Sequence, residues 1–277
     1  MIKLGKFNTL KVLRREEQGF YLEGDEEWGN ILLPNKYIPE GLEIDQDIEV
    51  FIYFDSEDII IATTKKPLAT VGEFASLKVA QAAEFGIFLD WGLEKDLFVP
   101  FREQIFKMEV GQSYVVHIYV DSSNRISAST RLNKYLGRSL AQFKEGQPVD
   151  LLLYQTTSMG YKAIIDGSHS GLIFKDDIVN NLRIGQKVEG FIKKIREDGK
   201  FDLSLRPLVK AKTDDLSAQI IEKLKEAGGT LDINSKSSAE SINAMFNVSR
   251  KKFKVALGAL YKKKIISTDD SGIQLIK

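Results

Sequence analysis

Short alternating runs of apolar and polar residues fill the chain from about residue 70 to residue 130. The apolar positions include Ile87, Leu89, Leu97, Val99 and Ile118, and polar or glycine-containing segments interrupt the runs every several residues. Side chains of a strand point alternately to the two faces of a sheet, so this pattern predicts half-buried antiparallel strands. We expect about five strands here, at residues 70–78, 86–90, 96–99, 113–121 and 125–129.

The same block occurs three times along the chain. Residues 34–65 align with residues 100–131 at an offset of 66, without a gap. A third copy follows at an offset of 74, so that Gly160 corresponds to Gly86. Repetition at a fixed spacing indicates repeated structural units. The chain is therefore expected to contain three related small domains.

Five short strands with a helical turn after the third are typical of a small closed barrel, usually an OB-fold. In that fold the face formed by strands two and three binds oligonucleotides or oligosaccharides. We predict a mainly β protein with three tandem five-stranded barrels at residues 1–66, 67–146 and 147–209. Residues 132–146 are expected to form a helix that links the second barrel to the third.

After Pro207 the apolar residues change to helical spacing. Leu216, Ile220 and Leu224 lie on one face of a predicted helix, and the Gly228-Gly229 pair is expected to end it, because glycine adopts the left-handed cap conformation readily.

Two more helices and a hairpin are predicted after this first helix. Ser237 and Glu240 have the spacing of a capping box that opens the second helix, and Ser249 is placed to cap the third. Residues 265–276 read as a β-hairpin. Three helices and a hairpin in this order resemble a winged helix, which predicts an α+β domain at residues 210–277.

The second copy contains two segments that resemble a known RNA-binding module. FGIFLDW begins at residue 85 and DLFVPFRE begins at residue 96. Both resemble the S1-type RNA-binding domain, a barrel of the OB class. The resemblance implies that Phe85 and Phe88 stack on bases and that Asp121 and Arg125 flank the binding groove. Pro100 stands where the S1 family often has histidine.

The first and third copies keep the same pattern of predicted strands but differ in the residues expected on the binding surface. In the first, Tyr21 takes the position of Phe88, but Ile59 replaces the basic residue, so we expect a weaker RNA binder. In the third, the corresponding surface is supplied by Lys162, Phe174 and Lys200. That surface is expected to be more cationic and to stack less.

The third helix of the C-terminal domain carries a second set of candidate residues, Arg250, Lys251, Lys254 and Lys262. At about 100° per residue, the lysines project away from the apolar side of the helix. They are candidates for contact with nucleic acid. The alternatives are a merely solvated charged face and a winged helix that docks a protein.

Three S1-type domains followed by a basic helical module resemble the conserved virulence factor B family of bacterial RNA-binding proteins. The resemblance spans nearly the whole chain, and residues 160–162 and 171–174 suggest it most. It implies a role in post-transcriptional gene regulation, including regulation of virulence.

Charge is distributed unevenly although the chain is neutral overall. Residues 1–66 carry 14 acidic and 8 basic residues, whereas residues 210–277 carry 13 basic and 8 acidic residues. Neutralisation of phosphates supplies most of the sequence-independent affinity for nucleic acid, so the first barrel is expected to contribute least. Base stacking must then supply the affinity of the neutral second barrel. This combination favours single-stranded RNA, whose bases are not already stacked in a duplex.

No pattern of catalytic or metal-binding residues is found. The two histidines, His117 and His169, belong to different repeats, and phosphate-binding loops and nucleophile elbows are absent. We therefore expect a non-enzymatic protein without a metal or a cofactor. The chain has no cysteine, no secretory signal and no apolar run of membrane length, so we expect a cytoplasmic protein that does not contact a membrane.

Three functions remain open at this stage. The leading hypothesis is binding of single-stranded RNA on the second and third barrels, assisted by the winged helix. The second is a scaffold that docks proteins of the ribosome, the polymerase or the RNA-degradation machinery. The third is a DNA-binding regulator that acts through the winged helix.

Overall fold

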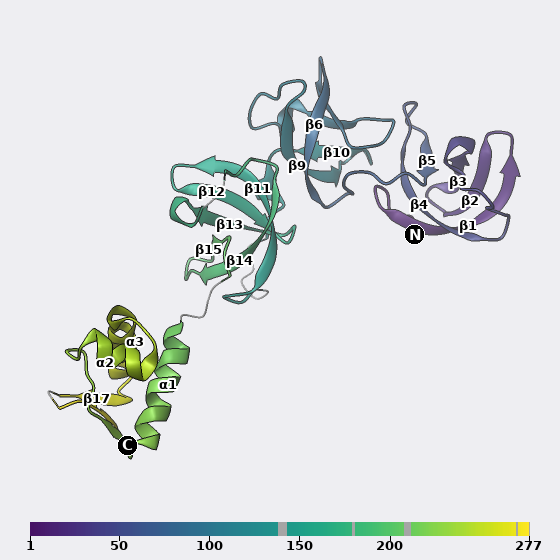
Figure 1. Cartoon of the computed structure of the whole chain (residues 1–277). Helices are drawn as coiled ribbons and strands as arrows, with labels where there is room; N and C mark the ends of the chain where they lie inside the picture. Colours follow the sequence, from purple (N-terminus) through teal and green to yellow (C-terminus); the bar gives the residue numbers. More distant parts are fainter. Residues whose placement is uncertain (138–142, 179–180, 208–211, 270, 277) are drawn as a thin grey trace. The chain divides into compact units, whose positions relative to one another are not determined.

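The computed structural model describes residues 1–137, 143–178, 181–207, 212–269 and 271–276, which fall into two compact units. The first unit, Met1–Arg206, is built almost entirely from strands, and the second, Pro207–Lys277, combines three helices with a small sheet (Figure 1). The predicted fold class, three tandem five-stranded barrels followed by a winged-helix domain, is confirmed.

Barrel 1 shows the topology that all three barrels share. It consists of β1 (Phe7–Glu16), β2 (Gly19–Asp25), β3 (Gly29–Pro34), β4 (Asp47–Phe54) and β5 (Ile60–Thr63). The strands follow the order β1-β2-β3-β5-β4, and the pairing of β1 with β4 closes the barrel. β3 and β5 are parallel, and the other neighbours are antiparallel.

Barrels 2 and 3 repeat this order. Barrel 2 consists of β6 (Phe74–Ala83), β7 (Gly86–Asp90), β8 (Leu97–Pro100), β9 (Ser113–Val120) and β10 (Ile126–Ser129). Barrel 3 consists of β11 (Pro148–Thr157), β12 (Gly160–Ile165), β13 (His169–Phe174), β14 (Lys187–Ile195) and β15 (Phe201–Ser204). A 3₁₀ turn follows the third strand of each barrel: η1 (Asn35–Tyr37), η2 (Phe101–Glu103) and η4 (Lys175–Asp177).

Two predicted elements in this unit differ from the structure, and the first of them, the strand expected at residues 70–78, also ends later, at Ala83. The first strand of barrel 2 begins at Phe74 rather than at Thr70, because the Thr70 N–H donates to Glu73 Oε2 and forms a turn there. The helix expected at residues 132–146 is, up to Gly137, a single 3₁₀ turn, η3 (Leu132–Lys134). The Gly137 N–H donates to the Ser168 carbonyl of barrel 3 instead of continuing a helix. Residues 138–142 of that prediction lie outside the described residues.

Barrels 1 and 2 share one apolar core cluster. At their junction the ring of Trp91 packs edge-on against the ring of Phe51, with centroids 5.7 Å apart. The Leu68 N–H donates to the Trp91 carbonyl at 2.7 Å. The Phe51–Trp91 contact is buried, so the two barrels pack against each other at this junction.

The second unit has the order of a winged helix. Its elements are α1 (Lys212–Glu226), β16 (Thr230–Leu231), α2 (Ala239–Phe246), α3 (Arg250–Lys262), β17 (Ile266–Thr268) and β18 (Ile273–Leu275). The strands form a sheet in the order β16-β18-β17, of which β16 was not predicted from the sequence. Within the described residues, no helix is both long enough and apolar enough to cross a membrane.

The helix ends of this unit show which capping predictions hold. Gly228 and Gly229 both have positive φ, and the Gly229 N–H donates to the Leu224 carbonyl, so the predicted end of α1 is confirmed. Ser249 caps α3 as predicted. The cap of α2 is Ser238 rather than Ser237, because the Ser237 hydroxyl already accepts the Asn234 N–H in the preceding turn.

Candidate nucleic-acid interface

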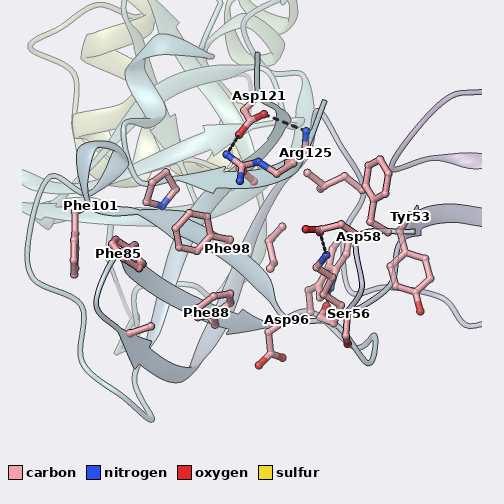
Figure 2. A pocket seen from close by; sticks show the side chains of 18 of the residues that line it. Tyr53, Ser56, Asp58, Phe85, Phe88, Asp96, Phe98, Phe101, Asp121 and Arg125 are labelled. Atoms are coloured by element: carbon pink, nitrogen blue, oxygen red, sulfur yellow. Dashed lines mark hydrogen bonds and ion pairs between the residues drawn. The ribbon is translucent and has the colours of Figure 1, made fainter. Parts of the chain in front are cut away.

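Barrel 2 presents four phenylalanine rings on one outer surface. Phe88 and Phe98 lie on the neighbouring strands β7 and β8, with ring centroids 5.2 Å apart. Phe85 is 73% exposed and Phe101 is 53% exposed. Figure 2 shows these rings along one side of a groove. Exposed aromatic rings of this kind are the usual stacking surface for unpaired bases.

Strand alternation and one glycine put Phe88 and Phe98 in these positions. Their strand neighbours Leu89 and Leu97 are buried in the barrel, so both rings face outward. A Cβ atom at Gly86 would lie 2.4 Å from the Val99 carbonyl oxygen and 2.6 Å from the Phe98 ring. Only glycine therefore leaves room for the Phe98 ring where it lies.

Asp121 and Arg125 come together at the β9–β10 turn, and they have different roles. Asp121 Oδ1 accepts the backbone N–H groups of Ser123 and Arg125 at 2.7 and 3.1 Å, and its side chain is only 8% exposed. Arg125 is 60% exposed, and its Nη2 lies 3.5 Å from Asp121 Oδ2. Asp121 thus fixes the turn and orients Arg125, whose guanidinium is the group available to a phosphate.

The groove has a volume of about 700 Å³ and extends beyond barrel 2. One side carries the four rings and Arg125, and the other includes Ser56 and Asp58 from the β4–β5 turn of barrel 1 (Figure 2). A groove of this size accommodates more than one nucleotide-sized group.

An ion pair joins the two barrels across the groove. Lys95 of barrel 2 pairs with the Asp58 carboxylate and also donates to the Asp55 carbonyl oxygen at 2.6 Å. The hydrogen bond and charge of Lys95 hold the pKa of Asp58 below its ordinary value. Lys95 is therefore bound to barrel 1 and does not point freely into the groove.

On barrel 1 the corresponding aromatic surface is reduced to Tyr21. The guanidinium of Arg14 lies over the Tyr21 ring, 4.2 Å from its centroid, and Arg14 also pairs with Glu16 at 2.7 Å. At the position of Arg125, barrel 1 has the exposed Ile59. Barrel 1 thus offers one covered ring and no cation at the β4–β5 turn position.

Barrel 3 has a lysine in place of one ring of barrel 2 and further cations at its β14–β15 turn. Lys162 is partly exposed at the position of Phe88, and Lys200 is exposed and pairs with Asp198 at 2.7 Å. The ring of Phe174 lies 5.6 Å below the guanidinium of Arg196, which also pairs with Asp202 at 2.7 Å. Arg196 occupies the position of Asp121, because both start a four-residue turn with the same backbone hydrogen bond.

The four candidate cations of α3 are all exposed, and one of them also has a structural contact. Arg250 Nη2 lies 3.4 and 3.2 Å from the carbonyl oxygens of Ser235 and Lys236. Lys251, Lys254 and Lys262 project from the side of α3 opposite the buried core residues, as predicted. The lysines are therefore the cations of α3 best placed to meet a phosphate backbone.

Both histidines pack among aromatic rings. His117 lies between Phe74 and Tyr135, with ring centroids 4.7 and 3.8 Å away. Burial lowers the pKa of His117 to about 4, so its ring is neutral near pH 7. His169 packs edge-on against Phe143 and Phe201. Both histidines are therefore buried and take part in aromatic packing.

Comparison with known proteins identifies the domains. The S1 domain model matches residues 4–65 and 71–131, and the CvfB-like winged helix domain model matches residues 218–275. Conserved virulence factor B of Staphylococcus epidermidis is 26% identical over 284 aligned positions, which cover 99% of this chain and 95% of that protein. This chain belongs to the conserved virulence factor B family.

Two other similar proteins extend the comparison. The uncharacterized protein YitL of Bacillus subtilis is 28% identical over 93% of this chain and 89% of its own length. A crystal structure of a multidomain protein with nucleic acid binding domains from Streptococcus pneumoniae is 24% identical, with a TM-score of 0.43, and covers 99% of this chain and 98% of that one. The S1 and winged-helix domains of this conserved virulence factor B family member support nucleic-acid binding.

Three residues of the candidate interface in this family member were missed by sequence reasoning. Phe98 was not among the predicted site residues, although its place between the buried Leu97 and Val99 puts it on the outer face, a signal that the alternation already contained. Phe101 and Arg196 carried no such signal. Phe101 follows β8 in a 3₁₀ turn, and Arg196 approaches Phe174 only through the closure of barrel 3.

Proposed function

We propose that this chain is a non-enzymatic RNA-binding protein that holds single-stranded RNA on barrels 2 and 3, with α3 of the winged helix adding phosphate contacts. The observation that carries this proposal is the row of four phenylalanines beside Arg125 in one groove. Each base stacked on an aromatic side chain contributes about 1–3 kcal/mol. Bases inside a duplex are already stacked on each other, so such a surface favours unpaired RNA.

Barrels 2 and 3 would contribute in different ways. The rings of barrel 2 supply affinity that depends little on salt, because stacking does not release counterions. Lys162, Lys200 and Arg196 of barrel 3 supply affinity that falls with salt, because they neutralise phosphates. The acidic barrel 1 contributes least.

Membership of the conserved virulence factor B family extends the proposal to the cell. We propose post-transcriptional regulation, virulence genes among its targets, as the consequence of RNA binding. The name of the staphylococcal relative supports this part of the proposal. RNA of this kind is met in the cytoplasm, which is where we propose that the chain acts.

The experiment is fluorescence anisotropy of the full chain with labelled single-stranded RNA, single-stranded DNA and duplex DNA at two salt concentrations. We expect single-stranded RNA to bind most tightly. Replacing Phe85→Ala and Phe88→Ala together should weaken RNA binding at least tenfold, from the stacking energies above. Phe106→Ala is the matched control, because Phe106 is also exposed but packs on Tyr114 and does not line the groove.

Other results would change the proposed function. Equal RNA affinity of the double variant and the control would contradict the stacking model. Preference for duplex DNA that depends on Lys251 and Lys254 would favour the DNA-binding regulator. Absence of binding to all three nucleic acids would favour the protein-docking scaffold.

A further inference from the structure

A pair of carboxylates continues the outer face of β7 and β8 beyond the aromatic rings. Phe88 pairs with Phe98, and Leu89 pairs with Leu97. Since side chains alternate along each strand, Asp90 and Asp96 lie one step further on the same outer face as the two rings. That step is about 6–7 Å along the strand.

Of these two carboxylates, Asp96 is the one that faces the groove. It lines the groove together with Phe88 and Phe98 (Figure 2). Asp90 does not line the groove, and its Oδ1 accepts the Gly92 N–H at 2.9 Å. The neighbouring cation, Lys95, is held by Asp58 and the Asp55 carbonyl. Within the described part of the chain, the Asp96 carboxylate accepts no hydrogen bond and forms no ion pair.

The surroundings of Asp96 make this an unfavourable place for a carboxylate without a donor. Partial burial raises the pKa of Asp96 above its ordinary value, and the charge of Asp90 raises it further. A partly desolvated acceptor is stabilised when a donor comes within hydrogen-bonding distance. Two carboxylate oxygens side by side match a ligand with two parallel N–H donors.

We propose that Asp96 reads a guanine base of the bound RNA, stacked on Phe88 and Phe98, by accepting its N1–H and N2–H donors. This inference rests on the proposed function. Guanine alone presents two adjacent donors on its Watson–Crick edge. Adenine and cytosine place a ring-nitrogen acceptor beside their amino group, and uracil flanks its single N3–H with two carbonyl oxygens, which a carboxylate repels.

Barrels 1 and 3 have no carboxylate at this position. Asn30 stands there in barrel 1, and Ser170 stands there in barrel 3, where its hydroxyl lies 2.8 Å from Tyr154 Oη. Guanine reading is therefore assigned to the one barrel that also has the four rings. The protein would then recognise one nucleotide specifically, whereas its other contacts with the RNA would tolerate any sequence.

The test measures binding of the full chain to uridine decamers with one central guanosine, inosine or adenosine, and to the all-uridine decamer. A bidentate contact discriminates against bases that cannot form it, so we expect guanosine to bind about tenfold more tightly than adenosine or uridine. Inosine should lie between them, because it keeps N1–H and lacks the N2 amine. Asp96→Asn should abolish the preference, because its amide offers one acceptor and one donor.

Asp90→Asn is the matched control and should keep the guanosine preference. A guanosine preference that survives in Asp96→Asn, or equal affinity for all four decamers, would overturn the inference while leaving RNA binding on the rings intact. The decamer series tests the inference without any variant, so a folding defect of Asp96→Asn does not obscure it. Absence of binding to every decamer would overturn both this inference and the proposed function.

Discussion

Barrels 2 and 3 share one topology, but the residues on their outer surfaces differ in chemical character. Both follow the same strand order, and in each a glycine at the start of the second strand lets the third strand pass closely. On this shared frame barrel 2 places Phe85 and Phe88, whereas barrel 3 places Met159 and Lys162. Small and apolar residues determine the barrel fold, whereas the residues on its outer surface can differ between the two barrels.

Copies of one fold thus divide two kinds of affinity between them. Stacking on rings selects unpaired bases, whereas cations select phosphate and act on any sequence. In barrel 3 the ring of Phe174 lies beneath a guanidinium, so this ring presents positive charge outward. Exchanging or removing these features one at a time separates the two kinds of affinity.

The largest effect is expected when barrel 2 is given the surface of barrel 3, by Phe85→Met with Phe88→Lys. Each base that loses its ring loses about 1–3 kcal/mol. The new lysine should steepen the dependence of log affinity on log salt by about 0.7. Anisotropy titrations with single-stranded RNA at several salt concentrations measure both quantities.

The reciprocal exchange, Met159→Phe with Lys162→Phe in barrel 3, is the control for that experiment. It should tighten RNA binding at high salt and flatten the salt dependence. If both exchanges change affinity in the same direction, the division between stacking and charge is wrong.

The next effect concerns the frame rather than the surface. Gly86→Ala places a Cβ atom against the Val99 carbonyl and the Phe98 ring. Relieving this clash requires a shift of the backbone at Val99, which costs free energy of folding. We expect a loss of about 1–3 kcal/mol in the stability of barrel 2. Urea unfolding followed by tryptophan fluorescence measures it, because both tryptophans, Trp28 and Trp91, belong to barrels 1 and 2.

Gly258→Ala is the matched control for Gly86→Ala. Gly258 lies within α3, and a Cβ atom there would meet no neighbour within 4 Å. Alanine favours the helix, so no loss of stability is expected. The tryptophan transition should stay unchanged in Gly258→Ala, and an unchanged transition in Gly86→Ala would show that the crowding at Gly86 is unimportant.

Two substitutions of Arg196 can separate the contributions of its charge and of its planar guanidinium group. Arg196→Ala should weaken RNA binding by about 1 kcal/mol and flatten the salt dependence, through loss of a cation and of a stacking surface. Arg196→Lys should restore the salt dependence without restoring full affinity, because lysine has no planar face. Full recovery of affinity in the lysine variant would reduce the role of Arg196 to charge alone.

These features differ in how far the sequence predicts them. The barrels follow from local alternation, and the end of α1 follows from Gly228 and Gly229, because each signal lies within a few residues. The outward position of Phe98 also follows from its buried neighbours Leu97 and Val99, although Phe98 was not among the predicted site residues.

The composite features depend on contacts between distant parts of the chain. Lys95 meets Asp58 across 37 residues, and the unpartnered state of Asp96 follows only once Lys95 is known to be engaged. Arg196 meets Phe174 only after β13, β14 and β15 are paired. Local sequence patterns do not indicate contacts between residues that are far apart in the chain. The groove between barrels 1 and 2 was therefore not predicted.

The smallest effect is expected from the acidic wall that barrel 1 contributes to the groove. Asp58→Asn removes one negative charge and releases Lys95, so RNA affinity should rise about twofold at low salt and change little at high salt, where exposed charges are screened.

The pKa of Asp58 is depressed in the folded chain, so the pairing of Asp58 with Lys95 stabilises the junction between barrels 1 and 2 at pH values above the ordinary aspartate pKa. That contribution is lost as the pH falls below about 4 and the carboxylate takes up a proton. Trp91 reports this loss, because its Nε1 donates to the Lys95 carbonyl at 2.7 Å. An acid titration of Trp91 fluorescence should therefore lose one component in Asp58→Asn, and an unchanged titration would mean that the ion pair does not hold the two barrels together.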